Sequence, residues 1–237
     1  MKTLIVDDER LARKELINLL SDHRNIEIVG EAANADEALE FINKQDLDLL
    51  FLDIQMPGKT GFELLEMLDK TPAVIFTTAY DEYAIKAFDV NALDYLLKPI
   101  QPERLAESIQ KLSKVEEKRT KSSEGKLGLN DQVFVKDGDR CWFVSLSNIR
   151  LFESDGNYIK VHFDNNRPMI HKSLNALDEK LDQRSFFRAS RKHIVNLSWV
   201  EGIEPWFNGG LMVKLKGGDK VEVSRRQAAK FKEMMSL

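Results

Sequence analysis

The first half of the chain alternates between short apolar runs and segments in which apolar residues recur every three or four positions. The runs span residues 3–8, 26–32, 47–53, 73–79 and 92–99, and their nearly continuous hydrophobicity is typical of strands buried on both faces. The spacing between them predicts five helices, marked by Leu11, Leu16, Leu19 and Leu20; by Ala35, Ala38, Leu39 and Ile42; by Phe62, Leu65 and Leu68; by Tyr83, Ala84, Ala87 and Phe88; and by Leu105, Ile109 and Leu112. Five such units predict a doubly wound α/β domain with a five-stranded parallel sheet.

After residue 131 the period of the pattern changes to two. The alternating runs are separated by turn dipeptides, namely Asp137-Gly138, Asp155-Gly156, Asn165-Asn166, Asn208-Gly209 and Gly217-Gly218. Helical spacing returns only in residues 174–181 and 225–235, and Ser224 and Gln227 are spaced as a capping box for the second of these. This half therefore predicts a mainly antiparallel β domain.

The segment between the two halves is charged, contains Ser and Gly, and is poor in large apolar residues. This composition indicates the end of the fifth helix followed by a linker. We place the first domain at residues 1–117, the linker at 118–131 and the second domain at 132–237. A chain of 237 residues is long enough for two domains that each bury a core.

Charge is distributed unevenly between the halves. The net charge is −4, but residues 1–117 carry 13 basic against 24 acidic side chains, and residues 118–237 carry 22 against 15. Opposite signs favour two different partners, and a basic half suits a polyanion, although a solvated basic face would look the same. Cys141 has no second cysteine to pair with, and no apolar run is long enough to span a membrane. We therefore expect a cytoplasmic protein without membrane insertion.

Five polar residues follow the predicted parallel strands, where the chemistry of such sheets collects. Asp7 and Asp8 end the first strand, Asp53 the third, Thr78 the fourth and Lys98 the fifth. Three carboxylates together imply a divalent cation, and oxygen ligands favour Mg²⁺ over zinc. With the lysine, this cluster suits a transferred phosphoryl group and a carboxylate nucleophile at Asp53. Singly, each residue has an ordinary alternative as a helix cap, a surface charge or a strand residue.

The motifs VDDE, FLDIQMPGKTG, TTA and DYLLKP resemble those of the receiver domain of bacterial two-component response regulators. The resemblance covers about residues 1–117 and implies a flavodoxin-like fold phosphorylated at Asp53 by a sensor histidine kinase. It implies Mg²⁺ held by Asp8, Asp53 and the backbone carbonyl of Gln55, with Asp7 acting mainly through metal-bound water. The only catalysis implied is self-phosphorylation and autodephosphorylation of the receiver.

The same resemblance assigns the switch. Lys98 would pair with one phosphoryl oxygen, the Thr78 hydroxyl would move to bond another, and Tyr95 would turn inward. The Lys98-Pro99 bond becomes a candidate cis peptide bond. Phosphorylation would favour a homodimer through the fourth helix, fifth strand and fifth helix, and the first helix and the loop after Lys98 would govern the choice of kinase.

The second half carries no nucleophile–base pair, metal cluster or helix-turn-helix, so DNA binding would use loops or strands. The segments FESDGNYIKVHF, FFRASRKHIVNLSWVEGIE, PWFNGG and VEVSRRQAAKF resemble the LytTR DNA-binding domain from about residue 131 onward. In that family an elongated β fold inserts loops and the start of its last helix into successive major grooves of double-stranded DNA. The matching positions here are Asn157 and Tyr158; Arg191, Lys192 and His193; and Arg225 and Arg226.

Several of these residues also have structural interpretations. Tyr158 could be a packed strand aromatic, Arg188 could pair with a carboxylate at the core edge, and Arg225 could simply open a helix. Trp199 and Trp206 are expected in core or turn packing. The sequence thus predicts a phosphorylation-dependent transcriptional regulator. The alternatives are a receiver-controlled protein- or RNA-interaction module and, less supported, an enzyme with its activity in residues 118–237.

Overall fold

The structure is a computed structural model of the chain and describes residues 1–79, 94–116, 126–138 and 140–235. These residues form two compact units, which are described separately. The first comprises Met1–Thr120 with Gln132–Phe143, and the second comprises Lys121–Asp131 with Val144–Leu237. The predicted fourth helix, residues 81–92, lies outside the described residues.

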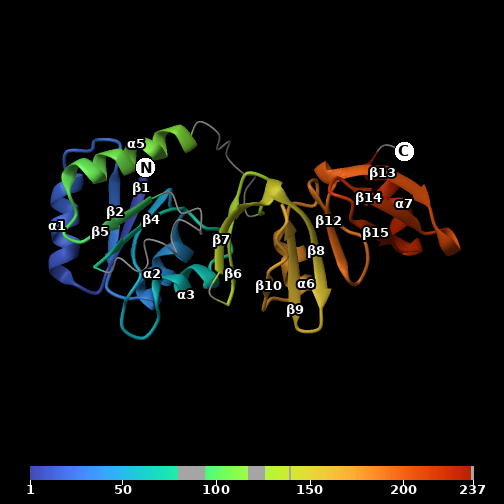
Figure 1. Ribbon diagram of the computed structural model, residues 1–237, viewed down its shortest axis with the longest axis horizontal. Coiled ribbons are helices and arrows are strands. Elements are labelled where there is room, and N and C mark those ends of the chain that lie inside the picture. The colour runs from blue at the N-terminus through green and yellow to red at the C-terminus, as the bar shows by residue number, and fades with distance from the viewer. Residues whose placement is uncertain (80–93, 117–125, 139, 236–237) are drawn as a thin grey trace. The chain divides into compact units, whose positions relative to one another are not determined.

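The first unit is built on a five-stranded sheet in the order β2-β1-β3-β4-β5, in which each neighbouring pair is parallel (Figure 1). This confirms the predicted fold class. Its elements are β1 (Lys2–Val6), α1 (Arg10–Leu20), β2 (Glu27–Ala32), α2 (Ala35–Lys44), β3 (Leu49–Asp53), α3 (Gly61–Met67), β4 (Ala73–Thr78), β5 (Asp94–Leu97) and α5 (Pro102–Glu116).

Alternate residues of the buried strands point to opposite faces of this sheet. Leu50 and Leu52 of β3 pack with α2 and α3, whereas Leu49 and Phe51 pack with α1 and α5. Because β3 and β4 are buried along their whole length, both faces need a helical cover. The carboxyl ends of the strands are thereby held in a fixed arrangement at one edge.

The second unit is mainly antiparallel, as predicted. Its larger sheet has the strand order β10-β9-β8-β12-β11 and its smaller sheet the order β13-β14-β15. The elements are β8 (Ile149–Asp155), β9 (Tyr158–Phe163), β10 (Met169–Ile170), α6 (Leu174–Lys180), β11 (Phe186–Arg188), β12 (His193–Asn196), β13 (Val200–Pro205), β14 (Leu211–Leu215), β15 (Lys220–Val223) and α7 (Arg225–Met234), with short 3₁₀ turns η1 (Leu146–Asn148), η2 (Leu197–Trp199) and η3 (Phe207–Gly209).

The division of the chain differs from the predicted boundaries. The hairpin of β6 (Gln132–Asp137) and β7 (Arg140–Ser145) contributes Phe134, Cys141 and Phe143 to the core of the first unit, although the sequence assigned it to the second domain. Residues 126–131, expected in the linker, belong to the second unit. Leu127 is buried there, and its amide donates to the Lys180 carbonyl at 2.8 Å. Sequence period alone could not assign a hairpin to either core.

The predicted capping box of the last helix does not form. Ser224 is the N-cap residue of α7, but its side chain makes no capping hydrogen bond. The Gln227 amide donates instead to the Ser224 backbone carbonyl at 2.8 Å. The spacing of a capping box is compatible with either arrangement, and here the backbone bond is the one made.

The core of the second unit joins the smaller sheet to α7, and Phe231 of α7 is fully buried in it. Its ring meets that of Phe187 at a centroid distance of 5.0 Å. Phe231→Ala should lower the free energy of unfolding of this unit by about 3–5 kcal/mol, because a buried ring is replaced by a cavity. Urea unfolding followed by tryptophan fluorescence measures the change.

The matched control is Phe207→Ala. Phe207 is 74% exposed, so this variant should stay within about 0.5 kcal/mol of the unchanged protein. Equal destabilisation by both substitutions would contradict the assigned core.

Candidate functional site

A buried ion-pair cluster occupies the carboxyl edge of the parallel sheet. The Lys98 Nζ lies 2.6 Å from Asp53 Oδ2 and 2.7 Å from Asp7 Oδ2. Asp7 and Asp53 are only 3% and 5% exposed. The ends of β1, β3 and β5 therefore bring together three of the residues that the sequence placed at this edge.

Asp8 completes an acidic group with these two aspartates. One carboxylate oxygen from each of Asp7, Asp8 and Asp53 lies within 4.8 Å of the others, and only Asp8 is exposed. An all-oxygen donor set with several negative charges fits a hard divalent cation of the Mg²⁺ type. Gln55, the predicted carbonyl ligand, lies two residues beyond Asp53, and its amide donates to Asp53 Oδ1 at 3.1 Å.

Burial and pairing act in opposite directions on the charges of the cluster. Burial raises the pKa of Asp53 above its usual value, although Lys98 and the Gln55 amide oppose the rise. Burial alone would lower the pKa of Lys98, but hydrogen bonds and charge attraction from Asp53 and Asp7 outweigh it and raise the pKa. The lysine is therefore a permanent cation, and a buried carboxylate needs such a partner.

Close packing holds the loop after Asp53 in place. A side chain at Gly61 would put its Cβ 2.4 Å from the Asp53 carbonyl oxygen, and the Gly61 amide donates to Ile54 at 2.9 Å. The helix α3 then begins with a capping box, in which Thr60 Oγ1 accepts from the Glu63 amide and Glu63 accepts from the Thr60 amide. This box was not among the predicted features, although the T-x-x-E spacing of Thr60 and Glu63 indicates it.

The two predicted switch residues are both buried. Thr78 ends β4 with no exposed surface, and its carbonyl accepts from the Lys98 amide at 2.8 Å. Tyr95 of β5 is 9% exposed and belongs to the core cluster on the α3 side of the sheet. The Lys98-Pro99 bond is cis, which confirms that expectation.

The predicted DNA contacts of the second unit lie on two loops and at the start of the last helix. Asn157 and Tyr158 are exposed at the β8–β9 turn, Arg191 and Lys192 are exposed between β11 and β12, and Arg225 and Arg226 are exposed in the first turn of α7. His193 begins β12 and is partly buried. Burial lowers the pKa of His193 from its ordinary value, which favours the neutral imidazole.

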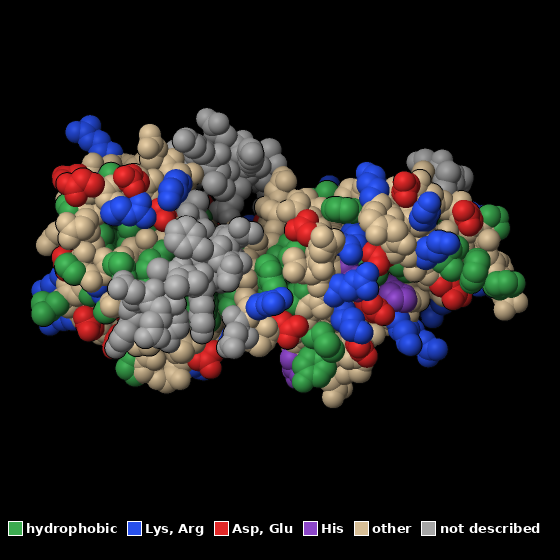
Figure 2. All heavy atoms as spheres, in the orientation of Figure 1, with side chains coloured by type: hydrophobic (Ala, Val, Ile, Leu, Met, Phe, Trp, Pro, Cys, Tyr) green, Lys and Arg blue, Asp and Glu red, His purple; other side chains and the backbone are tan. Residues whose placement is uncertain are grey.

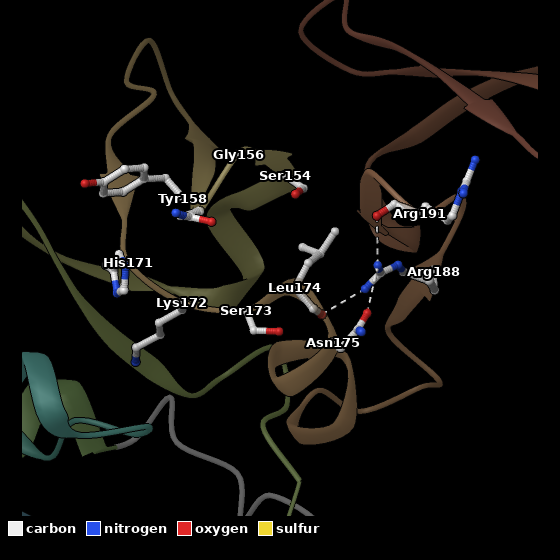
Figure 3. A pocket seen from close by; sticks show the side chains of 11 residues that line it. Ser154, Gly156, Tyr158, His171, Lys172, Ser173, Leu174, Asn175, Arg188 and Arg191 are labelled. Atoms are coloured by element: carbon white, nitrogen blue, oxygen red, sulfur yellow. Dashed lines mark hydrogen bonds between the residues drawn. The ribbon is translucent and has the colours of Figure 1, made fainter.

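The two loops border one cavity (Figure 3). It has a volume of about 680 Å³, and Tyr158 and His171 lie on one side with Arg191 on the other. Asn157 also lines it. The Tyr158 ring packs edge-on against His171 at 5.5 Å. Tyr158 is nonetheless 46% exposed, so it is neither fully packed in the sheet nor free of it.

Arg188 ties the Arg191 loop to α6. Its guanidinium donates to the backbone carbonyls of Leu174 at 2.9 Å, Ser190 at 2.7 Å and Arg191 at 2.9 Å, and to Asn175 Oδ1 at 3.1 Å (Figure 3). These four acceptors are carbonyl oxygens, and the Asp178 carboxylate adds a charge attraction to Arg188. The planar guanidinium carries five N–H donors and can bond several carbonyl oxygens at once. Such bonds to the backbone cannot be predicted from the sequence of residue types.

The tryptophans pack in turns, as expected. Trp199 Nε1 donates to the Ser147 carbonyl at 2.7 Å. Trp206 is 39% exposed and meets the Phe207 ring edge-on at 4.8 Å.

Figure 2 shows Lys and Arg side chains spread over the visible face of the second unit, with Asp and Glu between them. On that face the basic surplus is interspersed and does not form a single block.

Comparison with known proteins links each unit to a family. The family model of the response regulator receiver domain matches residues 3–110, and that of the LytTr DNA-binding domain matches residues 139–236. The chain is 39% identical to the sensory transduction protein LytT of Enterococcus faecalis and 31% identical to the transcriptional regulatory protein LytR of Staphylococcus aureus, with 100% of both chains covered in each case. The chain belongs to the LytT/LytR family of response regulators.

This response regulator is a DNA-binding transcriptional regulator of a two-component system, and its domains imply a histidine kinase and DNA as partners. The interaction-module alternative is not favoured. The response regulatory domain of mrkE from Klebsiella pneumoniae is 38% identical, with a TM-score of 0.46 over 50% of this chain and 100% of that domain. Among the described residues, no helix is both long and apolar enough to span a bilayer.

The bonds of Arg188 predict a positioning effect on DNA binding. Arg188→Ala should weaken DNA affinity roughly 10-fold, because binding must then order the Arg191 loop. The salt dependence of affinity should stay unchanged, because the guanidinium is engaged with protein acceptors. Fluorescence anisotropy over a series of salt concentrations measures both. A slope reduced by about one counterion would show a direct phosphate contact and contradict the positioning role.

Proposed function

We propose that Asp53 is the phosphoacceptor of this response regulator. The observation that carries the proposal is the convergence of Lys98, Asp7 and Asp53 within hydrogen-bond distance at the sheet edge. An Asp53 oxygen attacks the phosphorus of a kinase phosphohistidine. The bond from phosphorus to the histidine nitrogen breaks, and its electron pair stays on that nitrogen. Lys98 then exchanges its contact with Asp53 Oδ2 for a phosphoryl oxygen.

The acidic group supports a Mg²⁺ site. Asp8, Asp53 and the Gln55 carbonyl would hold the ion, and Asp7 would act through bound water. When bound, the cation supplies positive charge that offsets the phosphoryl oxygens. The same residues would support self-phosphorylation from small phosphodonors and autodephosphorylation.

The switch is assigned to Thr78 and Tyr95. Thr78 ends the strand beside β3 and is linked through its carbonyl to the Lys98 amide, so a shift of Lys98 toward the phosphoryl group acts directly on that strand end. Tyr95 is 9% exposed and lies in the core of the receiver. These two residues would carry the phosphorylation state away from Asp53.

The histidine kinase is proposed to dock across α1 and the start of α5. Leu11 is 81% exposed there, and a cavity of about 520 Å³ is lined by Leu11, Leu19, His23, Pro102 and Leu105 among others. Asp7 and Lys98 lie just before α1 and α5 in the chain. A kinase helix on this surface would therefore reach the acidic edge.

Dimerisation is proposed for the phosphorylated form, through residues 81–92, β5 and α5. Leu97 of β5 is 43% exposed, which leaves apolar surface for a partner. Asp94 bonds within the domain to Lys111 Nζ at 2.7 Å and Ser108 Oγ at 2.7 Å. A pairing of two receivers need shift the equilibrium by only a few kcal/mol to change DNA occupancy.

Double-stranded DNA is proposed to contact Asn157 and Tyr158, Arg191 to His193, and Arg225 with Arg226. All of these residues except the partly buried His193 are exposed, on two loops and in the first turn of α7, which supports this proposal, since loops and a helix start can enter successive grooves. Arginine suits bidentate contacts with guanine as well as phosphate contacts. Arg191 and Arg226 are the residues on which we place most weight.

Asp53→Ala should abolish phosphoryl uptake from a small-molecule phosphodonor in the presence of Mg²⁺, because the nucleophile is lost. Intact-mass spectrometry detects the added phosphoryl group directly. Asp46→Asn, at an exposed aspartate outside the acidic group, is the control and should take up phosphate normally. Undiminished uptake by the Asp53 variant would overturn the assignment.

Arg226→Ala should weaken binding to the preferred DNA site about 5- to 150-fold, because one base or phosphate contact is lost. Arg184→Ala is the control, since Arg184 is exposed, pairs with Asp182 at 3.1 Å and belongs to none of the proposed contact segments. Quantitative gel-shift titration at one fixed salt concentration compares the two variants. Equal losses in both would indicate a general charge effect and contradict a specific contact.

A further inference from the structure

The β6–β7 hairpin completes the hydrophobic core of the receiver. Phe134, Cys141 and Phe143 are each at most 6% exposed and belong to the same cluster as Leu52 and Phe76 of the sheet. In Figure 1 the hairpin runs beside α3. Most of this hairpin belongs to the first unit although it follows the linker in the sequence. Neither phosphoryl transfer nor DNA binding explains why it is packed there.

Four phenylalanine rings join the hairpin to the receiver. Phe62 of α3 meets Phe76 of β4 at 5.1 Å and Phe134 of β6 at 6.3 Å. Phe143 of β7 meets Phe76 at 6.4 Å and Phe134 at 5.2 Å. Each of the four side chains therefore contacts two of the others. Because protein interiors are close-packed, a displacement of Phe62 or Phe76 must also displace a side chain of the hairpin.

Polar contacts fix the register of the hairpin on the receiver. Lys136 Nζ lies 2.7 Å from Glu66 Oε1 on α3. The Thr71 amide, in the segment before β4, donates to the Gln132 carbonyl at 2.9 Å. The hairpin is thus attached to α3 and to the entry of β4 by directional bonds as well as by apolar contact.

Both receiver rings belong to segments that adjoin the phosphoacceptor. Phe62 follows Gly61, which packs directly against the Asp53 carbonyl. Phe76 precedes Thr78 by two residues and pairs in register with Leu52 of β3 and with Tyr95. A rearrangement of either the Asp53 loop or the Thr78 end of β4 therefore acts on a ring that touches the hairpin.

We propose that the β6–β7 hairpin, seated on Phe62 and Phe76, transmits the phosphorylation state of the receiver to the DNA-binding domain. The strand β7 runs from Arg140 to Ser145 and passes without interruption into the second unit at Val144, so movement of the hairpin reaches that unit through the chain itself. The inference rests on the proposed phosphorylation of Asp53 and adds a second output face besides the proposed dimer surface.

The test uses the full chain and measures the ratio of DNA affinities with and without a small-molecule phosphodonor and Mg²⁺. Phe134→Leu should reduce this ratio roughly 2- to 30-fold while phosphoryl uptake and basal DNA affinity stay unchanged. Phe41→Leu is the matched control, because Phe41 lies on α2 and packs over Gly30 of β2. It should retain the ratio.

A charge reversal provides a second test if Phe134→Leu does not fold. Lys136→Glu and Glu66→Lys should each lower the ratio, and the double variant should restore it, because the pair is only partly exposed and is remade with reversed signs. Folded variants with normal uptake and an unchanged ratio would overturn the transmission role alone. Failure of the unchanged protein to take up phosphate would overturn the proposed function, and this inference with it.

Discussion

The Lys98 ammonium between Asp7 and Asp53 is the interaction on which the receiver depends. Two buried carboxylates close together repel each other, and burial already raises the pKa of Asp53. One lysine pairs with both carboxylates, because parallel strands end at a common edge, but it offsets only one of the two negative charges. The Lys98 cation is in place before any phosphoryl group arrives, and a bound divalent cation would supply the remaining positive charge.

The rigidity of that edge also explains how a small change could act at a distance. Gly61 packs against the Asp53 carbonyl, α3 starts at that point, and Phe62 carries the contact to the hairpin. The DNA-binding half follows the same principle, because Arg188 secures a loop through backbone carbonyls. In both halves functional segments are positioned by contacts with the backbone.

Much of this was predictable from the sequence. Strand-end carboxylates, apolar runs and period-two segments depend on local pattern, so the sheet edge and both fold classes could be predicted. The assignment of the β6–β7 hairpin could not, since Phe134 suits either core and only tertiary packing decides between them. The bonds of Arg188 could not be predicted either, because every residue type carries a backbone carbonyl and the sequence does not indicate which of them accept a hydrogen bond. At Ser224 the prediction was wrong in the opposite direction: the spacing of Ser224 and Gln227 matches a capping box, but the Ser224 side chain makes no capping hydrogen bond.

The central claim is that phosphorylation at Asp53 controls recognition of particular DNA sequences. The most direct measurement is selection of bound fragments from the source genome by the purified protein at fixed, moderate salt. It is made with and without Mg²⁺ and a small-molecule phosphodonor, and with Asp53→Asn beside the unchanged chain. The account predicts recovery of one paired motif, enhanced by the phosphodonor only when Asp53 is present. Equal, sequence-independent recovery under all conditions would contradict it.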